Sequence, residues 1–475
     1  MGVNPTMPTP ELPPEIWLKI AHYVPSEEQN ALMNVSSLFF DVRMNSRWRQ
    51  VVVITRKTGQ AMHTLERLRC VPLVINFIDA LTVSSFCSDP FVAKRVKSLV
   101  LRLTHVKDPA TEAPSSPGFR HQLQHAYHRF RPFKPKSREG NGLHSGSPLR
   151  PRPTFSEVMN TLITTISHMS NVRELNIDSW DLPPSYDLRK VFHSMWASFG
   201  NSLDSLFLGG NLEGYRVLIA ETHPTFRHLR ELRIELTNNL FRLDQDADER
   251  TLVNVLAPFI TGLSSTLESL RIWSWAFLDI SAFFGVLAET TFPHLESLNI
   301  RMAFNKALHD PTGLQEFLWR SSATLKRVEL RLNPSGLPLA PATEEPLSVW
   351  LAQCLNDERC FRSINALDLY PTNTEAGLAS LLTCIKRTEA TLVELSIRDR
   401  YLQTAEAKVV VEAASRSESG LKSLRMNIWH LEVGLLDILA NKISGLERLW
   451  LSLGDSTGGF EGDSEVFVLS IRPYQ

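Results

Sequence analysis

The chain has 475 residues, of which 43% are hydrophobic, and its formal net charge at pH 7 is −1. This composition is sufficient for a large core, and the nearly neutral charge excludes bulk attraction to nucleic acid or to a membrane surface. No apolar run reaches about 18 residues, so no transmembrane helix is expected. The five cysteines are scattered and the N-terminus lacks the regions of a secretion signal, which favours a cytoplasmic or nuclear protein with reduced thiols.

The first predicted element is a small unit of three helices over residues 10–53, after a disordered start over residues 1–9. Pro13 and Pro14 suit the first turn of a helix, where the missing amide hydrogens would have no intrahelical acceptor. Ile16, Ile20 and Val24 then follow at helical spacing. A core of about forty residues is marginal on its own, so this unit is expected to pack against a neighbour.

The order and spacing of these residues resemble an F-box. The matching residues, with the helix-face Val24 added, are Leu12, Pro13, Glu15, Ile16, Ile20, Val24, Leu32, Val35, Ser36, Phe39 and Trp48. The segment from Pro25 to Asn30 departs from the family pattern, which has an acidic and leucine-containing stretch there.

The resemblance implies a role in an SCF ubiquitin ligase, with docking on a Skp-type adaptor and through it on a cullin. The adaptor-binding residues would then be Leu12, Pro13, Ile16, Ile20, Val24, Leu32, Val35 and Phe39. The alternative is a plain helical cap that closes one end of a repeat domain and binds no adaptor.

Residues 54–107 are expected to form the first repeat units, with a helix over 58–68 and a strand over 73–77. Residues 108–153 are rich in Pro, Ser, Gly and basic residues and poor in aliphatic ones, so we expect a disordered insertion. This segment contains a basic cluster from Arg129 to Arg138, which could be a nuclear-import signal or a nucleic-acid contact. We interpret it instead as part of a solvated linker. His121, His125 and His128 lack the further ligand and rigid frame that a metal site requires.

A phrase with apolar residues at its first, fourth and sixth positions recurs eleven times. The copies begin at Val96, Val172, Leu203, Leu229, Leu267, Leu295, Leu325, Ile364, Leu392, Leu421 and Leu446. The fourth and sixth positions lie two apart and share one face of a strand, and helical patterns separate the copies. The clearest copy runs from Leu203 to Asn211, with a turn expected at Gly209-Gly210-Asn211.

This period predicts an α/β fold, a right-handed leucine-rich-repeat solenoid with parallel strands inside and helices outside. The main solenoid is expected over 154–453, with loop insertions around 237–251 and 333–346 and an irregular C-terminal end over 454–475. With the N-terminal unit, the chain resembles the fungal-type F-box proteins with leucine-rich repeats.

No catalytic, cofactor-binding or metal-binding motif is present: there is no phosphate loop, dinucleotide fingerprint, Cys-x-x-Cys pair or His-Glu-x-x-His. The sequence therefore predicts neither an enzyme nor a cofactor. Cys354 and Cys360 are expected to be buried free thiols.

Strand alternation predicts two columns of side chains on the exposed face of the sheet. The first column reads Asn176, Phe207, Arg233, Arg271, Asn299, Glu329, Asp368, Ser396, Arg425, Trp450. The second reads Asp178, Gly209, Glu235, Trp273, Arg301, Arg331, Tyr370, Arg398, Asn427, Ser452. Arg301 and Arg331 should be neighbours, and Glu329, water or an acidic ligand could compensate their repulsion.

Exposed Trp, Tyr and Arg are favoured at binding hot spots, so this face is the candidate site for an unknown protein partner, for which an acidic or phosphorylated segment is one hypothesis. The candidate residues are Phe207, Arg271, Trp273, Arg301, Arg331, Tyr370, Arg398, Arg425 and Trp450. A solvated face with balanced charges is the alternative. The sequence thus predicts a substrate receptor of an SCF ubiquitin ligase, with a repeat-protein scaffold without ubiquitin role as the alternative and nucleic-acid binding as the weakest hypothesis.

Overall fold

The computed structural model describes residues 90–102, 155–179, 187–237 and 245–454, apart from 277, 305, 334–340, 359, 371 and 373. It also describes the strands 50–54, 73–76 and 466–470 and some positions between 16 and 49. The predictions for residues 1–9, the helix at 58–68, the insertion at 108–153, and Leu12, Pro13, Leu32, Val35 and Phe39 lie outside the described residues.

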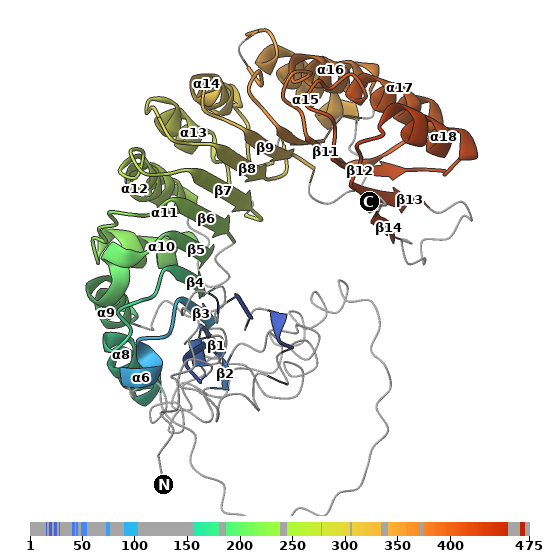
Figure 1. The fold of residues 1–475 in the computed structure, drawn as a ribbon. Coiled ribbons are helices and arrows are strands. Elements are labelled where there is room, and N and C mark those ends of the chain that lie inside the picture. Colours follow the sequence, from blue (N-terminus) through green and yellow to red (C-terminus); the bar gives the residue numbers. More distant parts are fainter. Residues whose placement is uncertain are drawn as a thin grey trace, which may run out of the picture.

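The described chain is an α/β structure in which one curved sheet forms the inside of an arc and the helices cover its outside (Figure 1). The strands are β1 (Gln50–Ile54), β2 (Leu73–Asn76), β3 (Ser98–Arg102), β4 (Glu174–Asp178), β5 (Ser205–Gly210), β6 (Glu231–Leu236), β7 (Ser269–Ser274), β8 (Ser297–Arg301), β9 (Arg327–Arg331), β10 (Ala366–Leu369), β11 (Glu394–Leu402), β12 (Ser423–Ile428), β13 (Arg448–Leu453) and β14 (Val466–Ser470).

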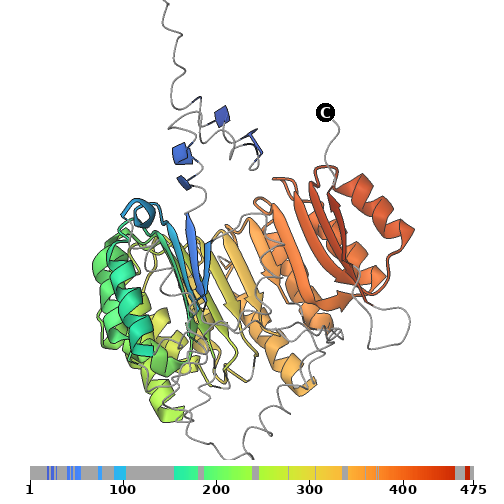
Figure 2. The same cartoon turned by 90° about the horizontal axis from the view of Figure 1, so that it is seen from below.

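Helices alternate with the strands from β3 onward, and they lie on one side of the sheet only (Figure 2). They are α6 (Pro90–Ala93), α8 (Phe155–Ser167), α9 (Arg189–Phe199), η3 (Gly200–Ser202), α10 (Leu212–Tyr215), η4 (Arg216–Ala220), α11 (Gln245–Thr251), η5 (Leu252–Leu256), α12 (Ala257–Thr261), α13 (Ser281–Ala288), α14 (Thr312–Ser321), α15 (Pro341–Cys354), α16 (Glu375–Arg387), α17 (Thr404–Ala414) and α18 (Val433–Lys442).

The core lies between the sheet and the helices, and the repeated phrase supplies its inner layer. In all eleven copies the residues at the first, fourth and sixth positions are buried, and none is more than 7% exposed. The fourth and sixth residues of each copy lie in a strand, so the predicted strand positions from β3 to β13 are confirmed. Because each strand can bury this apolar face only under its own helix and its neighbours, the repeats depend on one another for stability.

The order of the strands follows the chain from β3 to β14, but the first three are ordered β2-β1-β3. β1 pairs directly with β3, from Gln50–Ser98 to Ile54–Arg102. The predicted boundary of the N-terminal unit at residue 53 therefore falls inside a strand of the sheet. At the other end β14 pairs antiparallel with β13, while every other pairing in the sheet is parallel.

The prediction of a turn after Leu208 is wrong. Gly209 and Gly210 belong to β5, and a Cβ atom on Gly210 would lie 2.8 Å from the Ser179 Oγ atom, so the glycine allows a close approach between strand ends. Asn211 is instead the N-cap of α10, and its Oδ1 atom accepts a hydrogen bond of 2.9 Å from the Gly214 amide.

The two expected loop insertions also contain helical residues, because α11 begins at Gln245 and α15 at Pro341. None of the helices in the described part of the chain combines the length and the apolar character needed to cross a membrane.

Candidate binding surface on the inner face of the sheet

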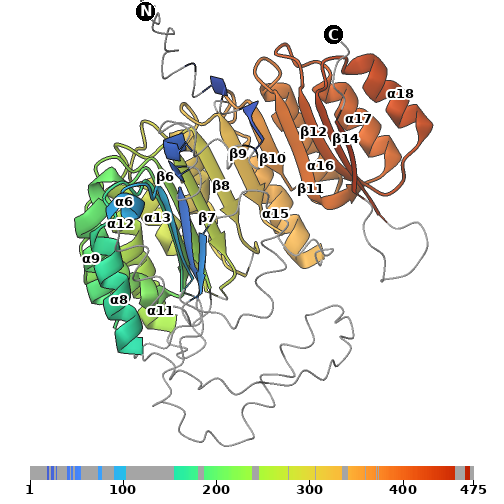
Figure 3. The same cartoon turned by 60° about the horizontal axis from the view of Figure 1, so that its bottom comes forward.

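The inner face is the side of the sheet opposite the helices α8 to α18, and its strands can be followed in Figure 3. The first predicted column is confirmed over its full length: adjacent strands pair residue by residue from Asn176–Phe207 through Asn299–Glu329 to Arg425–Trp450. This register places Phe207, Arg271, Arg425 and Trp450 in one column, as predicted. Phe207, Arg271 and Trp450 are half-buried and Arg425 is exposed.

The second column is confirmed from Asp178 to Arg331, including the pairing of Arg301 with Arg331. It is wrong at Tyr370, whose side chain is only 2% exposed. β10 ends at Leu369, so the alternation of a strand no longer determines the direction of the next side chain.

The second column is also wrong at Arg398. A bulge between Ile397 and Tyr401 shifts the register of β11, so that Tyr401 instead of Arg398 pairs with Asn427. The inserted residues redirect the Arg398 side chain across the sheet toward β9 and β10.

An arginine–tryptophan cluster, formed by Phe207, Arg233, Trp273, Trp275 and Arg301, lies over β5 to β8. The Arg233 guanidinium carbon lies 4.5 Å from the ring centroid of Phe207 and 4.0 Å from that of Trp273. The guanidinium of Arg301 lies 5.1 Å from the Trp273 ring and 4.6 Å from the Trp275 ring. These stacked contacts hold the arginines in fixed orientations on the face of the sheet.

The buried Glu235 contacts two members of this cluster, Trp275 and Arg233. Its side chain is 8% exposed, accepts a hydrogen bond of 2.9 Å from the Trp275 indole Nε1 and lies 3.3 Å from Arg233 Nη2. Burial lowers the pKa of the Arg233 guanidinium, and the positive charge of Arg271 lowers it further, while Glu235 raises it in part. The cluster therefore holds positive charge in a partly desolvated position.

A chain of polar contacts continues from the cluster toward the C-terminal strands. The Trp273 indole donates to Asn299 Oδ1 at 2.8 Å, and the Asn299 amide donates to Glu329. Arg398 donates to Glu329 at 2.9 Å and also to Asp368. Burial raises the pKa of the Asp368 carboxyl, and the hydrogen bond from Arg398 offsets this effect only in part. Glu329, one of the three groups that could compensate Arg301 and Arg331, has Arg398 and Asn299 as partners.

A groove of about 320 Å³ crosses the inner face over β7 to β13. It is lined by five arginines and three carboxylates: Arg271, Arg327, Arg398, Arg425, Arg448, Glu329, Asp368 and Glu394, with Trp450 on the last of these strands. Glu394 forms ion pairs with Arg327 at 2.8 Å and with Arg448 at 3.0 Å, across the small side chains of Ala366 and Ser423. The structure therefore brings Arg271, Arg398, Arg425 and Trp450 into one groove.

Four residues of this surface are not among the candidates predicted from the sequence: Arg233, Trp275, Arg327 and Glu394. Arg233 belongs to the first column and lies between Phe207 and Arg271, so its position was predictable. Arg327 and Glu394 occupy the strand position two residues before that column, which has the same orientation, so the same alternation could have found them. Trp275 follows the end of β7, where alternation gives no guidance.

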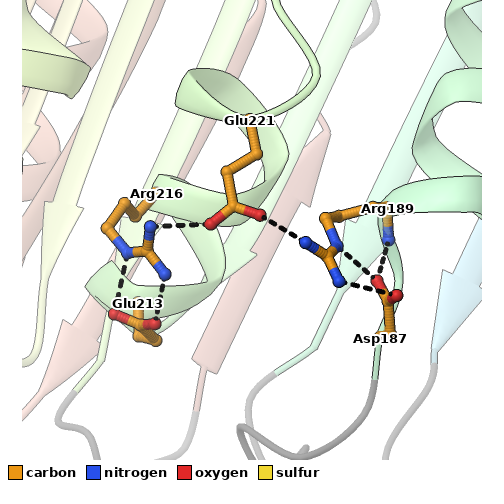
Figure 4. A network of polar contacts seen from close by, with 5 residues as sticks. All are labelled: Asp187, Arg189, Glu213, Arg216 and Glu221. Carbon is orange, nitrogen blue, oxygen red and sulfur yellow. Dashed lines mark hydrogen bonds and ion pairs between the residues drawn. The ribbon is translucent and has the colours of Figure 1, made fainter.

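A separate charged network connects neighbouring repeats on the helical side of the sheet (Figure 4). Arg216 contacts Glu213 at 2.8 Å and Glu221 at 2.6 Å, and Arg189 contacts Asp187 at 2.8 Å and Glu221 at 3.6 Å. The hydrogen bond from Arg189 lowers the pKa of Asp187. Since both arginines have carboxylate partners and are substantially exposed, this network supports the packing of the repeats and offers little to a ligand.

In the N-terminal segment, three of the predicted adaptor-binding residues are described. Ile16 and Ile20 are helical and exposed, at 40% and 38%, and Val24 is half-buried. Tyr23 on the same turn is 86% exposed and Phe40 is 38% exposed. Large apolar side chains therefore reach the surface in this segment.

The thiols of Cys354, Cys360 and Cys384 are buried and free, as predicted for the first two. Burial raises the pKa of Cys360 and of Cys384 to about 12, so neither is a thiolate at neutral pH. Across the described ranges, no group of His, Cys, Asp and Glu side chains is arranged to hold a metal ion.

The chain matches no protein-family model and no curated protein sequence. Its function therefore has to be inferred from the residues of the inner face and of the N-terminal segment.

Proposed function

We propose that this protein is a substrate receptor of an SCF-type ubiquitin ligase, built as an N-terminal F-box followed by a right-handed leucine-rich-repeat solenoid. The inner face binds a target protein, and the N-terminal segment binds a Skp-type adaptor and through it a cullin. The chain itself supplies no catalytic group in this role, because ubiquitin transfer is carried out by the recruited enzymes.

The observation that carries the proposal is the difference between the two faces of the sheet. Helices cover one face. The other face presents Arg233 and Arg301 stacked on Trp273 and Trp275. Aromatic and arginine side chains on rigid strands lose little conformational entropy on binding, and these residue types dominate protein–protein hot spots. Such a surface supports a role in holding a protein partner.

The adaptor half of the proposal is supported by the exposed Ile16, Ile20 and Tyr23. Large apolar side chains at helical spacing are suited to packing against a partner, and burying one of them contributes about 1.5–3 kcal/mol. The alternative, a scaffold without a ubiquitin role, needs the inner face alone and assigns no partner to these residues.

The test is the binding of the purified full-length chain to a purified Skp-type adaptor, measured by calorimetry. Ile16→Ala with Ile20→Ala should weaken binding by about tenfold or more, because two apolar contacts are lost. Val349→Ala with Val433→Ala, which truncates two exposed apolar residues elsewhere (51% and 75%), should leave it unchanged. Lack of wild-type binding, or equal binding by both variants, would overturn the ubiquitin role and leave the scaffold.

A further inference from the structure

We propose that Arg233 and Arg271, side by side on β6 and β7, bind the side-chain carboxylate of one Asp or Glu residue of a partner protein. This inference deepens the proposed function and rests on it, since it gives one chemical requirement of the target on the inner face. It depends on the register of the two arginines, on the few polar partners that they have, and on the fixed orientation of Arg233.

The register of the sheet places the two arginines next to each other. Arg233 pairs directly with Arg271, and their guanidinium carbons lie 4.0 and 5.6 Å from the Trp273 ring centroid, so both side chains lie on the same face. Neighbouring strands lie about 4.8 Å apart, and like charges opposite each other on such strands destabilise the sheet. Burial lowers the pKa of the Arg233 guanidinium, and the charge of Arg271 lowers it further. A negative group between the two side chains would relieve this repulsion.

The two arginines have one carboxylate partner between them. Glu235 lies 3.3 Å from the Nη2 atom of Arg233, and it also accepts the hydrogen bond of the Trp275 indole. The Nε atom of Arg233 is buried without a hydrogen-bond partner among the described residues. The side chain of Arg271 contacts the Trp273 ring and forms no ion pair or hydrogen bond with any residue that the structure describes. One more carboxylate would therefore balance the charges of Arg233, Arg271 and Glu235.

Two other carboxylates of the inner face do not supply this charge. Glu329 lies two strands from Arg271 in the same column and is in an ion pair with Arg398 at 2.9 Å. The exposed Glu231 lies two positions before Arg233 on β6, and its carboxylate forms no ion pair with a described residue. A carboxylate from a partner can therefore complement the arginine pair.

Arg233 is held in a fixed orientation for this contact. Its guanidinium carbon lies 4.5 Å from the ring centroid of Phe207 and 4.0 Å from that of Trp273, so rings from both neighbouring strands pack against it. A side chain that is already ordered loses little conformational entropy when it binds a ligand. A charge-assisted hydrogen bond in such a partly desolvated position is also stronger than one in open solvent.

A carboxylate fits the charge of the site better than a phosphorylated side chain does. With Glu235 in place, Arg233 and Arg271 carry a single positive charge in excess. A carboxylate neutralises this excess, whereas a phosphate group with nearly two negative charges at neutral pH would leave the site negative. The exposed Trp275 of the arginine–tryptophan cluster offers an apolar surface for a residue next to the acidic one.

The experiment presents the full-length chain to a phage-displayed library of short random peptides. The selected peptides should carry Asp or Glu at one position, close to apolar residues. Selection on Arg271→Gln should lose the preference for an acidic residue there, and selection on Arg320→Gln should retain it. Arg320 is the matched control, because it is an exposed arginine on α14, on the helical side of the sheet.

A synthetic copy of a selected peptide then gives a quantitative test by calorimetry. With the wild type and with Arg320→Gln, Gln in place of the acidic residue should weaken binding at least about tenfold, because a charge-assisted contact is lost. With Arg271→Gln the same peptide change should have a much smaller effect, since the contact is already missing. Arg271→Lys keeps the charge and should bind the acidic peptide more tightly than Arg271→Gln does.

Three outcomes would each overturn the inference: no enriched acidic position, an equal effect of the peptide change on the wild type and on Arg271→Gln, or tighter binding of the peptide with phosphoserine in place of the acidic residue. Adaptor binding by the wild type is measured separately. If the acidic peptide binds as expected and the adaptor does not bind, the proposed ubiquitin role is overturned and the carboxylate site stands. If the adaptor binds and the peptide results fail, only the inference is overturned.

Discussion

At the residue scale, Asp279 connects two successive repeats. Its carboxylate accepts hydrogen bonds from the Ser281 amide at 3.0 Å and from the His309 amide at 3.3 Å, and the His309 ring lies 3.2 Å away. Ser281 is in the first turn of α13, and His309 precedes α14. Burial raises the pKa of Asp279, but the hydrogen bonds from Ser281 and His309 outweigh it, and the pKa lies below 3.8.

The lowered pKa of Asp279 predicts how the stability of the protein depends on pH. Because the pKa of Asp279 is lowered in the folded state, its contribution is present above the unfolded value of 3.8 and is lost as pH falls through the folded value. Asp279→Asn should cost about 1 kcal/mol or less at neutral pH, since the side chain is partly exposed, and less in acid. Urea unfolding midpoints at neutral and acidic pH measure this, and an equal difference from wild type at both pH values would contradict it.

Residues inside regular strands were predictable, and residues beside irregular backbone were not. The register of Phe207, Trp273 and Arg301 follows from apolar positions two apart, which is local information. The predicted orientations of Tyr370 and Arg398 were wrong because the end of β10 and the bulge in β11 depend on how neighbouring strands and loops pack. No local pattern in the sequence marks either event.

At the element scale, the packing of α13 against α14 depends on a glycine. A Cβ atom on Gly313 would lie 2.5 Å from the Gly285 nitrogen and 2.8 Å from the Phe284 carbonyl carbon, which is backbone that cannot easily move. A Cβ atom on Gly285 would meet nothing within 4 Å. The two helices therefore approach closely at Gly313, while Gly285 has open space.

Gly313→Ala should lower the free energy of unfolding by about 1–3 kcal/mol, because the helices must separate to admit the methyl group. Gly285→Ala is the matched control and should be neutral or raise stability by up to about 1 kcal/mol, as expected for alanine in a helix. Urea unfolding followed by circular dichroism measures both. Equal effects of the two substitutions would contradict the close approach.

The elements themselves were largely predictable because each repeat carries the same apolar phrase. The helices α8, α9, α13, α16 and α18 lie between successive copies of this phrase, where helical patterns were predicted. The order β2-β1-β3 was not predictable, because the choice between two neighbours for β1 depends on contacts far apart in the chain. The turn predicted at Gly210 was wrong for a related reason, because the close approach of Gly210 to Ser179 joins residues that are distant in the chain.

At the scale of the whole molecule, the arc follows from the widths of its two layers. Neighbouring parallel strands lie about 4.8 Å apart, whereas helices with their side chains need about 10 Å. Stacking one strand and one helix per repeat therefore forces the helical layer to the longer, outer side (Figure 1). The uncovered strands are thereby placed on the inside of the arc, where side chains from β7 to β13 can contact one ligand together.

The same architecture leaves a strand edge at each end of the sheet, and β14 covers the edge of β13 by pairing from Arg448–Ser470 to Ser452–Val466. An uncovered edge presents free backbone donors and acceptors that can pair with another molecule. Deletion of residues 466–475 should therefore cause self-association that increases with protein concentration, while deletion of residues 471–475 should not. Sedimentation velocity over a concentration series distinguishes the two, and a monomeric 466–475 deletion would show that β14 is not needed to protect β13.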